Sequence, residues 1–303
     1  MERFTFDFIG RRRIWYVLSS ILIIPGILAL IVWHLNVGID FKGGTVQDIS
    51  FNTAPNIEDA RLLIGQQHIK GVNVQTSGKQ DILVRFPEQQ GIVARVTGNS
   101  VATALKTRYP DARESSFTSI GSSVAADTIK QALYAVTIAS LAIILFIAFS
   151  FRSIPKPASS WRFGFTAIAA LAHDILFVIG AFALLGHFFP NIEVDSLFIT
   201  AILTILGFSV NDTIVVFDRI RENLRRSPSK SFAEIANSSL NQTLARSINT
   251  STTVLLVLLA LLLLGGSSIR NFVLALTLGV AIGTYSSIFN ASPLLVSWQG
   301  RSK

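Results

Sequence analysis

Long runs of apolar residues dominate the pattern of this chain. Six runs are long enough to cross a lipid bilayer, which takes about 20 helical residues. They cover residues 14–35, 131–151, 163–186, 195–217, 246–264 and 270–297. The fifth run needs its polar start to reach full length, because its purely apolar part is short. The pattern therefore predicts an α-helical integral membrane protein with six transmembrane helices, and an amphipathic surface helix over residues 231–244.

The segment between the first two runs has a different pattern. Residues 36–130 mix charged, polar and apolar positions, as a water-soluble domain does. Four strands are expected at 45–51, 71–76, 81–86 and 113–120, with a hairpin turn at Ser77-Gly78. One helix is expected after an Asn56 cap and another over 97–108. The order β-α-β-β-α-β is that of a ferredoxin-like α+β domain.

These patterns divide the chain into three parts. Residues 1–35 form the N-terminus and first helix, 36–130 the α+β domain, and 131–303 the remaining five helices. The first apolar run follows a basic start, but it is too long for a cleavable signal peptide and has no small-x-small cleavage site after it. We therefore expect it to be a retained membrane span.

Basic residues are concentrated in alternate loops. Residues 1–13, 152–162 and 218–246 are rich in Lys and Arg, whereas 187–196 and 265–269 contain neither. Basic loops face the cytoplasm, so both termini are predicted to be cytoplasmic and the α+β domain extracytoplasmic. This distribution also explains the net charge of +8 without nucleic-acid binding.

Composition narrows the chemistry further. Half of the residues are hydrophobic, 15% are charged, and the mean hydropathy is +0.53, as expected for a protein in contact with membrane lipid. There is no cysteine, and the histidines are not spaced to form a metal site. We expect neither a metal nor an organic cofactor.

Polar residues interrupt two of the apolar runs. Asn211 and Asp212 lie within the fourth run, where a charge costs roughly 2.5–3.5 kcal/mol and commonly marks an ion or proton pathway. At the head of the fifth run, one helical face carries Arg246, Asn249, Thr250 and Thr253. We predict that Asp212 meets this face and handles a proton or another cation. The alternative is a fixed ion pair that only holds two helices together.

The third run contains a second titratable pair, His173 and Asp174. Histidine titrates near neutral pH, so the pair could belong to a proton relay. A histidine inside a membrane can equally serve as a hydrogen-bond partner in helix packing. The two interpretations remain open at this point.

Small residues suggest two further features. Gly38, Asp40, Gly43 and Gly44 follow the first run, where we interpret the glycines as a hinge between membrane and outer domain; a turn that requires positive φ is the alternative. In the sixth run, Gly279, Gly283 and Ser287 follow a small-xxx-small spacing that is typical of close helix packing.

Five motifs resemble those of a known family. They are GIDFKGG (38–44), AHD (172–174), GFSVNDTIVVFDRIREN (207–223), RSINTSTT (246–253) and GTYSSIFNASPLL (283–295). In this order they resemble the SecF-type members of the SecD/SecF family, part of the bacterial Sec protein translocase and of the wider resistance-nodulation-division class. The resemblance covers most of the chain and is weakest over residues 52–112.

The resemblance implies a function. Such proteins use the proton-motive force to promote polypeptide translocation on the outer side of the bacterial cytoplasmic (inner) membrane. The implied partners are a SecD-like subunit, the SecY/SecE/SecG channel, YajC, the exported polypeptide and membrane lipid. The family's proton-handling positions correspond to Asp212 and Arg246, and the choice between H⁺ and Na⁺ stays open.

Three other functions remain as alternatives. A small-molecule or lipid exporter of the same class would normally have two six-helix units and two outer domains in one chain, or form a homodimer, whereas this chain has one such unit. An intramembrane aspartyl protease could use Asp174 and Asp212, but the usual GxGD motif is absent and Arg246 would disturb the pair. In a pure scaffold, replacing Asp212 by Asn would have no effect.

Overall fold

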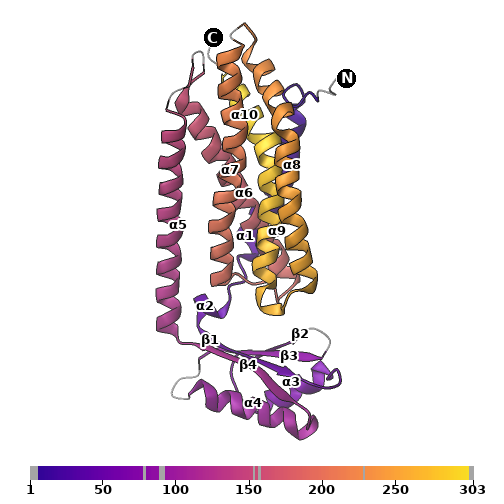
Figure 1. Ribbon diagram of the computed structural model, residues 1–303. Helices are drawn as coiled ribbons and strands as arrows, with labels where there is room; N and C mark the ends of the chain where they lie inside the picture. Colours follow the sequence, from indigo (N-terminus) through magenta and orange to yellow (C-terminus); the bar gives the residue numbers. More distant parts are fainter. Residues whose placement is uncertain are drawn as a thin grey trace. The chain divides into compact units, whose positions relative to one another are not determined.

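The structure is a computed structural model that describes residues 6–77, 80–88, 93–152, 154–155, 158–227 and 229–299. The chain forms two compact units (Figure 1). We call Val37–Leu133 the sheet unit, and Met1–Asn36 together with Tyr134–Lys303 the helical unit. The hairpin turn expected at Ser77-Gly78 lies partly outside the described residues.

The sheet unit has the predicted ferredoxin-like order. Its strands are β1 (Gly44–Ser50), β2 (Asn73–Ser77), β3 (Asp81–Phe86) and β4 (Arg113–Ile120), and its helices are α2 (Ile39–Lys42), α3 (Ile57–Gly65) and α4 (Ala94–Arg108). The sheet order is β2-β3-β1-β4, with antiparallel neighbours throughout. Helices α3 and α4 lie on one side of the sheet (Figure 1). This confirms the α+β fold expected between the first two membrane helices.

Alternation along the strands builds the core of this unit. Ile49 on β1 is directly opposite Ile82 on β3, and both are buried on the face that carries the helices. Val101 and Leu105 of α4 complete the same core. As predicted, Asn56 caps α3, since its side chain accepts a hydrogen bond from the Glu58 backbone N–H.

Six helices of the described chain are long and apolar enough to cross a membrane, as the sequence predicts. They are α1 (Arg12–Trp33), α5 (Ser122–Ser150), α6 (Ser160–Phe188), α7 (Ser196–Arg226), α8 (Phe232–Leu264) and the segment Arg270–Gln299. The last segment consists of α9 (Arg270–Ser286), the π-helix η2 (Ser287–Ala291) and α10 (Ser292–Gln299), and follows the 3₁₀ turn η1 (Ser267–Ile269). Helix α5 runs from the sheet unit into the helical unit.

One sequence expectation about α8 is wrong. The predicted surface helix over 231–244 and the fifth span are a single continuous helix. A capping box between Ser231 and Glu234 starts it, and no glycine or proline interrupts it before Gly265. The polar first half of α8 therefore continues the membrane helix.

Glycines allow close helix contact in the helical unit. Gly26 of α1 and Gly180 of α6 face each other so closely that a Cβ built on either would lie 2.7–2.8 Å from the Cα of the other. At one end of the unit, Phe151, Phe163 and Phe217 pack together and are almost completely buried. These contacts hold α6 and α7 in the positions that form the site described next.

Candidate functional site

Small residues bring α9 against α7. A Cβ built on Gly279 would lie 2.3 Å from Ile205 Cδ1, and one on Gly283 would lie 3.3 Å from Ser209 Cβ. One turn further along, Ser287 reaches Asp212. The predicted small-xxx-small spacing thus forms the contact with α7, and its third member is part of the polar site.

Asp212 lies near the middle of α7 and is only 6% exposed. The Ser247 hydroxyl of α8 donates to Asp212 Oδ1 over 2.7 Å, and the Ser287 hydroxyl of η2 donates to Oδ2. Three helices therefore meet at one carboxyl group, and both of its described partners are neutral hydroxyls. The RSINTSTT motif contains Ser247, but its pattern favoured Arg246, Asn249, Thr250 and Thr253, and the small-xxx-small spacing indicated only a packing role for Ser287.

The expected contact between Asp212 and Arg246 is not present. Arg246 is exposed, and no ion pair joins it to Asp212 in the part of the chain that the structure describes. The reason is the rotation of α8: Ser247, not Arg246, points to α7, and Ser251 on the same face accepts a hydrogen bond from Thr284 over 2.6 Å. The polar face predicted around Arg246 is real but turns away from the site.

The other predicted polar residues lie on this outward side. Helices α7 and α8 are antiparallel, since Asp212 contacts Ser247 and Asn223 contacts Ser239. In a pair of antiparallel helices, the residues that directly precede two facing residues point to the same side of the pair. Asn211 and Arg246, which precede Asp212 and Ser247, therefore share one side. The structure therefore forms an exposed polar face that consists of Asn211, Arg246, Asn249, Thr250 and Thr253.

His173 and Asp174 form a second buried group. Asp174 is completely buried, and its Oδ1 lies 2.9 Å from His173 Nδ1. The Ser209 hydroxyl donates to Asp174 Oδ2 over 2.5 Å. Because Ser209 lies one turn before Asp212 on α7, the two carboxyl groups lie on neighbouring turns of one interface. Each has its own hydroxyl partner, and no hydrogen bond joins them among the described residues.

The glycines after α1 satisfy a geometric requirement. Gly43 has φ 72° and Gly44 has φ 124°. Residues with a side chain rarely adopt such positive φ values, whereas glycine does so readily. A Cβ on Gly44 would also lie 3.0 Å from the Phe86 carbonyl oxygen within the sheet unit. Gly38 is extended, and Asp40 lies in the first turn of α2. The turn that requires positive φ is therefore present, and the hinge remains a hypothesis.

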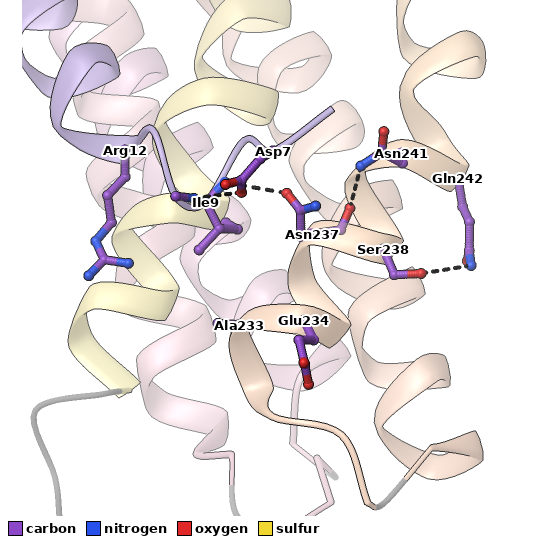
Figure 2. Close-up of a pocket in the computed structure, with 10 residues that line it drawn as sticks. Asp7, Ile9, Arg12, Ala233, Glu234, Asn237, Ser238, Asn241 and Gln242 are labelled. Atoms are coloured by element: carbon purple, nitrogen blue, oxygen red, sulfur yellow. Dashed lines mark hydrogen bonds between the residues drawn. The ribbon is translucent and has the colours of Figure 1, made fainter. Parts of the chain in front are cut away.

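A cavity of about 780 Å³ lies between the N-terminal segment and the start of α8 (Figure 2). Two asparagines on neighbouring turns of α8 fix this segment: Asn241 accepts a hydrogen bond from Phe6 N, and Asn237 accepts one from Phe8 N. Both also donate to the Phe6 carbonyl oxygen. This pair was not predicted from the sequence, although two asparagines at i and i+4 share a helix face.

Comparison with known proteins places the chain in a family. Residues 100–301 match the family described as protein export membrane protein SecD/SecF, C-terminal. The chain belongs to the SecD/SecF family. It is 46% identical to the protein translocase subunit SecF of Thermobaculum terrenum, over 97% of this chain and 94% of the relative. It is 39% identical to SecF of Haemophilus influenzae, over 94% of this chain and 83% of the relative.

Relatives with a fused SecD part are also similar. Over 97% of its length this SecD/SecF member is 35% identical to the SecDF translocase subunit of Bacillus subtilis, of which it covers 38%. A crystal structure of SecDF, a translocon-associated membrane protein from Thermus thermophilus, matches 98% of this chain with a TM-score of 0.85 and 33% identity. The chain covers 39% of that protein.

These relationships fix the broad role of the protein. It is a multi-pass membrane protein of the Sec protein-export system. Its relatives are named as subunits of a protein translocase, which is a transport-accessory role and not an enzymatic one. The SecDF relatives support a SecD-like partner for this SecF-type chain. Asp174, Asp212, Ser247 and Ser287 all lie within the residues that match the family.

Proposed function

We propose that this protein works with a SecD-like subunit, beside the SecY/SecE/SecG channel, to convert the proton-motive force into movement of exported polypeptides on the outer side of the bacterial cytoplasmic membrane. The observation that carries the proposal is the environment of Asp212. It is a buried carboxyl group in the middle of a membrane helix, held by two hydroxyl groups and by no described cation.

Hydroxyl partners suit a group that changes protonation state. A serine hydroxyl can donate to a carboxylate, and it can accept from a carboxylic acid. Ser247 and Ser287 can therefore satisfy Asp212 in both states, whereas an arginine partner would favour only the charged one. Movement of one charge through the membrane field supplies roughly 2.3 kcal/mol per 100 mV. That energy is large enough to bias two conformations of the protein.

The second buried carboxyl group extends the pathway. Ser209 connects the turn that carries Asp212 to Asp174, and Asp174 contacts His173. These groups provide further positions at which a proton could reside between the two sides of the membrane. We assign His173 and Asp174 a supporting role in the path to and from Asp212.

The exposed polar face is the proposed membrane contact with the SecD-like subunit. Arg246 lies beside Ser247 and hence at the depth of Asp212, but it is exposed. An arginine facing lipid at this depth would be unfavourable. A SecD-like subunit with acidic or carbonyl groups would cover Arg246, Asn249, Thr250 and Thr253, together with Asn211. Arg246 then acts on the pathway from the subunit boundary.

The remaining features fit an alternating motion. From the basic loops we infer that both termini lie in the cytoplasm and the sheet unit outside. Two crystal structures of SecDF match this chain with the same identity and coverage but TM-scores of 0.85 and 0.68, the second being the Super-membrane-facing form. The corresponding part of SecDF thus adopts more than one conformation. Gly38, Asp40, Gly43 and Gly44 would allow the sheet unit to follow such a change.

Replacement of Asp212 by Asn tests the function in cells. Asn keeps the size of the side chain but removes the exchangeable charge. We expect Asp212→Asn to slow export in cells whose only copy carries it, while membrane level and co-purification of the SecD-like subunit stay normal. Asp218→Asn, in the same helix but paired with Arg221, is the matched control and should leave export unchanged. Normal export by Asp212→Asn would favour a scaffold.

A further inference from the structure

Ser287 has more acceptors than it has protons to donate. It is completely buried and is the first residue of the π-helix η2. Its hydroxyl oxygen lies in hydrogen-bond contact with Asp212 Oδ2 and 3.1 Å from the backbone oxygen of Thr284. A serine hydroxyl carries one proton. Ser287 therefore donates to one of these two acceptors at a time.

Ser247 differs from Ser287 in this respect. It donates to Asp212 Oδ1 over 2.7 Å, and no second acceptor for its hydroxyl is found in the described chain. Its hydrogen bond therefore holds one carboxyl oxygen without a competing choice. The two serines on Asp212 are chemically alike, but only Ser287 can exchange its acceptor.

We propose that Ser287 is a positioning residue that transmits the protonation state of Asp212 to the last membrane helix. The inference rests on the proposed function, in which Asp212 gains and loses a proton. When Asp212 is ionised, Ser287 donates to Oδ2. When Oδ2 binds a proton, the acid donates to the Ser287 oxygen, and Ser287 turns its own proton to the Thr284 carbonyl. Only the proton on Asp212 is transferred, and no proton leaves Ser287.

The location of the exchange gives it a structural consequence. In a π-helix the backbone hydrogen bonds run from i to i+5, and such turns occur frequently at functional sites. Thr284 lies one turn before this irregular segment, and its hydroxyl contacts Ser251 of α8 over 2.6 Å. A new hydrogen bond at the Thr284 carbonyl therefore acts where η2, α9 and α8 meet.

No other described side chain takes this role. From α6, the titratable groups that lie toward α7 are His173 and Asp174, which are engaged with each other and with Ser209. From α8, Arg246 is exposed beside Ser247. Helix α9 has its only charged residue, Arg270, at its first position, and its titratable Tyr285 donates a hydrogen bond to the Trp15 carbonyl oxygen of α1. The described hydroxyl groups that contact Asp212 are those of Ser247 and Ser287, and of these two only Ser287 has a second acceptor.

Infrared difference spectroscopy tests the proposal on the full chain in complex with its SecD-like subunit. Spectra at acid and alkaline pH should show a carbonyl stretch from protonated Asp212, which Asp212→Asn removes. In Ser287→Ala the protonated Asp212 loses its acceptor, so we expect this band to move to higher frequency. The ionised Asp212 loses its donor, so we expect proton-dependent export to fall roughly tenfold, as for a lost hydrogen bond to a charged group. Ser292→Ala is the matched control, because Ser292 is equally buried and has no described contact with Asp212.

The outcomes separate the two claims. If Asp212→Asn exports normally and the band persists, the proposed function is wrong. If Asp212→Asn abolishes the band and proton-dependent export, but Ser287→Ala gives the same band and export as Ser292→Ala, the proposed role of Ser287 is wrong and that of Asp212 stands. If Ser287→Ala does not accumulate, Ser287→Cys replaces it, since a thiol fills the space but donates and accepts weakly; the same two results then decide.

Discussion

At the scale of single residues, the fully and partly buried carboxyl groups of this protein differ in their hydrogen-bond partners. Asp212 and Asp174 each have hydroxyl partners inside the helical unit. Asp48 of the sheet unit has a buried Oδ1 with no hydrogen-bond partner among the described residues. An unsatisfied buried oxygen disfavours the charged form. The local hydrogen-bond partners of a carboxyl group, not its residue type, therefore decide whether its charged form stabilises or destabilises the fold.

Asp48 should make the sheet unit less stable at neutral pH. Burial, with the nearby Asp81 charge as a second cause, raises the pKa of Asp48. A carboxyl group whose pKa is raised on folding stabilises the fold least when ionised, so stability falls as pH rises from the ordinary value through the raised pKa. We expect Asp48→Asn to increase the free energy of unfolding above this window and to have no such advantage at acid pH.

Hydrogen exchange of peptides from β1 and β3, corrected for intrinsic pH dependence, measures this stability. Asp81→Asn serves as a second variant and should give a smaller change in the same direction, since it removes only the lesser cause. An Asp48→Asn variant that is less stable than the parent across the neutral range would contradict this explanation.

Two glycines in neighbouring membrane helices should respond oppositely to alanine. A Cβ on Gly279 would lie 2.3 Å from Ile205, whereas a Cβ on Gly207 of α7 would have no atom within 4 Å. We expect Gly279→Ala to cost about 1–3 kcal/mol through overpacking and Gly207→Ala to be neutral or slightly stabilising because alanine favours helix. Thermal unfolding in detergent compares the two variants, and equal melting temperatures would argue against close contact of α7 and α9.

At the scale of elements, the sequence predicted which segments form helices and strands better than it predicted how the helices rotate. The six apolar runs and the β-α-β-β-α-β order follow from periodicity and length, and the structure confirms them. The rotation of α8 could not be predicted, because nearly every residue from Arg246 to Thr253 is polar and offers more than one polar face. Opposite charge made Arg246 the expected partner of Asp212. In the structure the smaller Ser247 packs against α7 and contacts Asp212 instead.

One feature left no signal in the pattern. The π-helix at Ser287–Ala291 lies in an otherwise continuous helix, and neither proline nor glycine marks its start. It depends on tertiary contacts, which a single sequence does not contain. The continuity of α8 was misjudged for another reason: residues 231–244 are polar and were predicted as a separate surface helix, although no glycine or proline separates them from the fifth span.

The N-terminal segment should depend on the two asparagines of α8. Backbone N–H groups of Phe6 and Phe8 donate to Asn241 and Asn237. We expect Asn237→Ala combined with Asn241→Ala to release the segment, at about 1–3 kcal/mol for the lost hydrogen bonds. Faster hydrogen exchange at Phe6 and Phe8 is the readout. The control is Ser238→Ala, which removes a neighbouring hydroxyl that has no described bond to the segment, and unchanged exchange in the double variant would show that other contacts fix it.

At the scale of the whole molecule, the polar residues inside the membrane helices fall into an enclosed set and an exposed set. The buried carboxyl groups are enclosed within this chain, but the polar face of Asn211 and Arg246 is exposed beside them. A SecD-like subunit completes the membrane site in the proposed mechanism. The six-helix unit then supplies the proton-binding group, and its partner covers the arginine.

The most direct test is polypeptide translocation in proteoliposomes that contain the channel, the SecD-like subunit and this protein, with and without an imposed proton gradient. For the parent protein the gradient should increase translocation. For Asp212→Asn the gradient should have no effect, while translocation without a gradient remains equal to that of the parent. An equal response of both proteins to the gradient would contradict the claim that Asp212 couples proton movement to export.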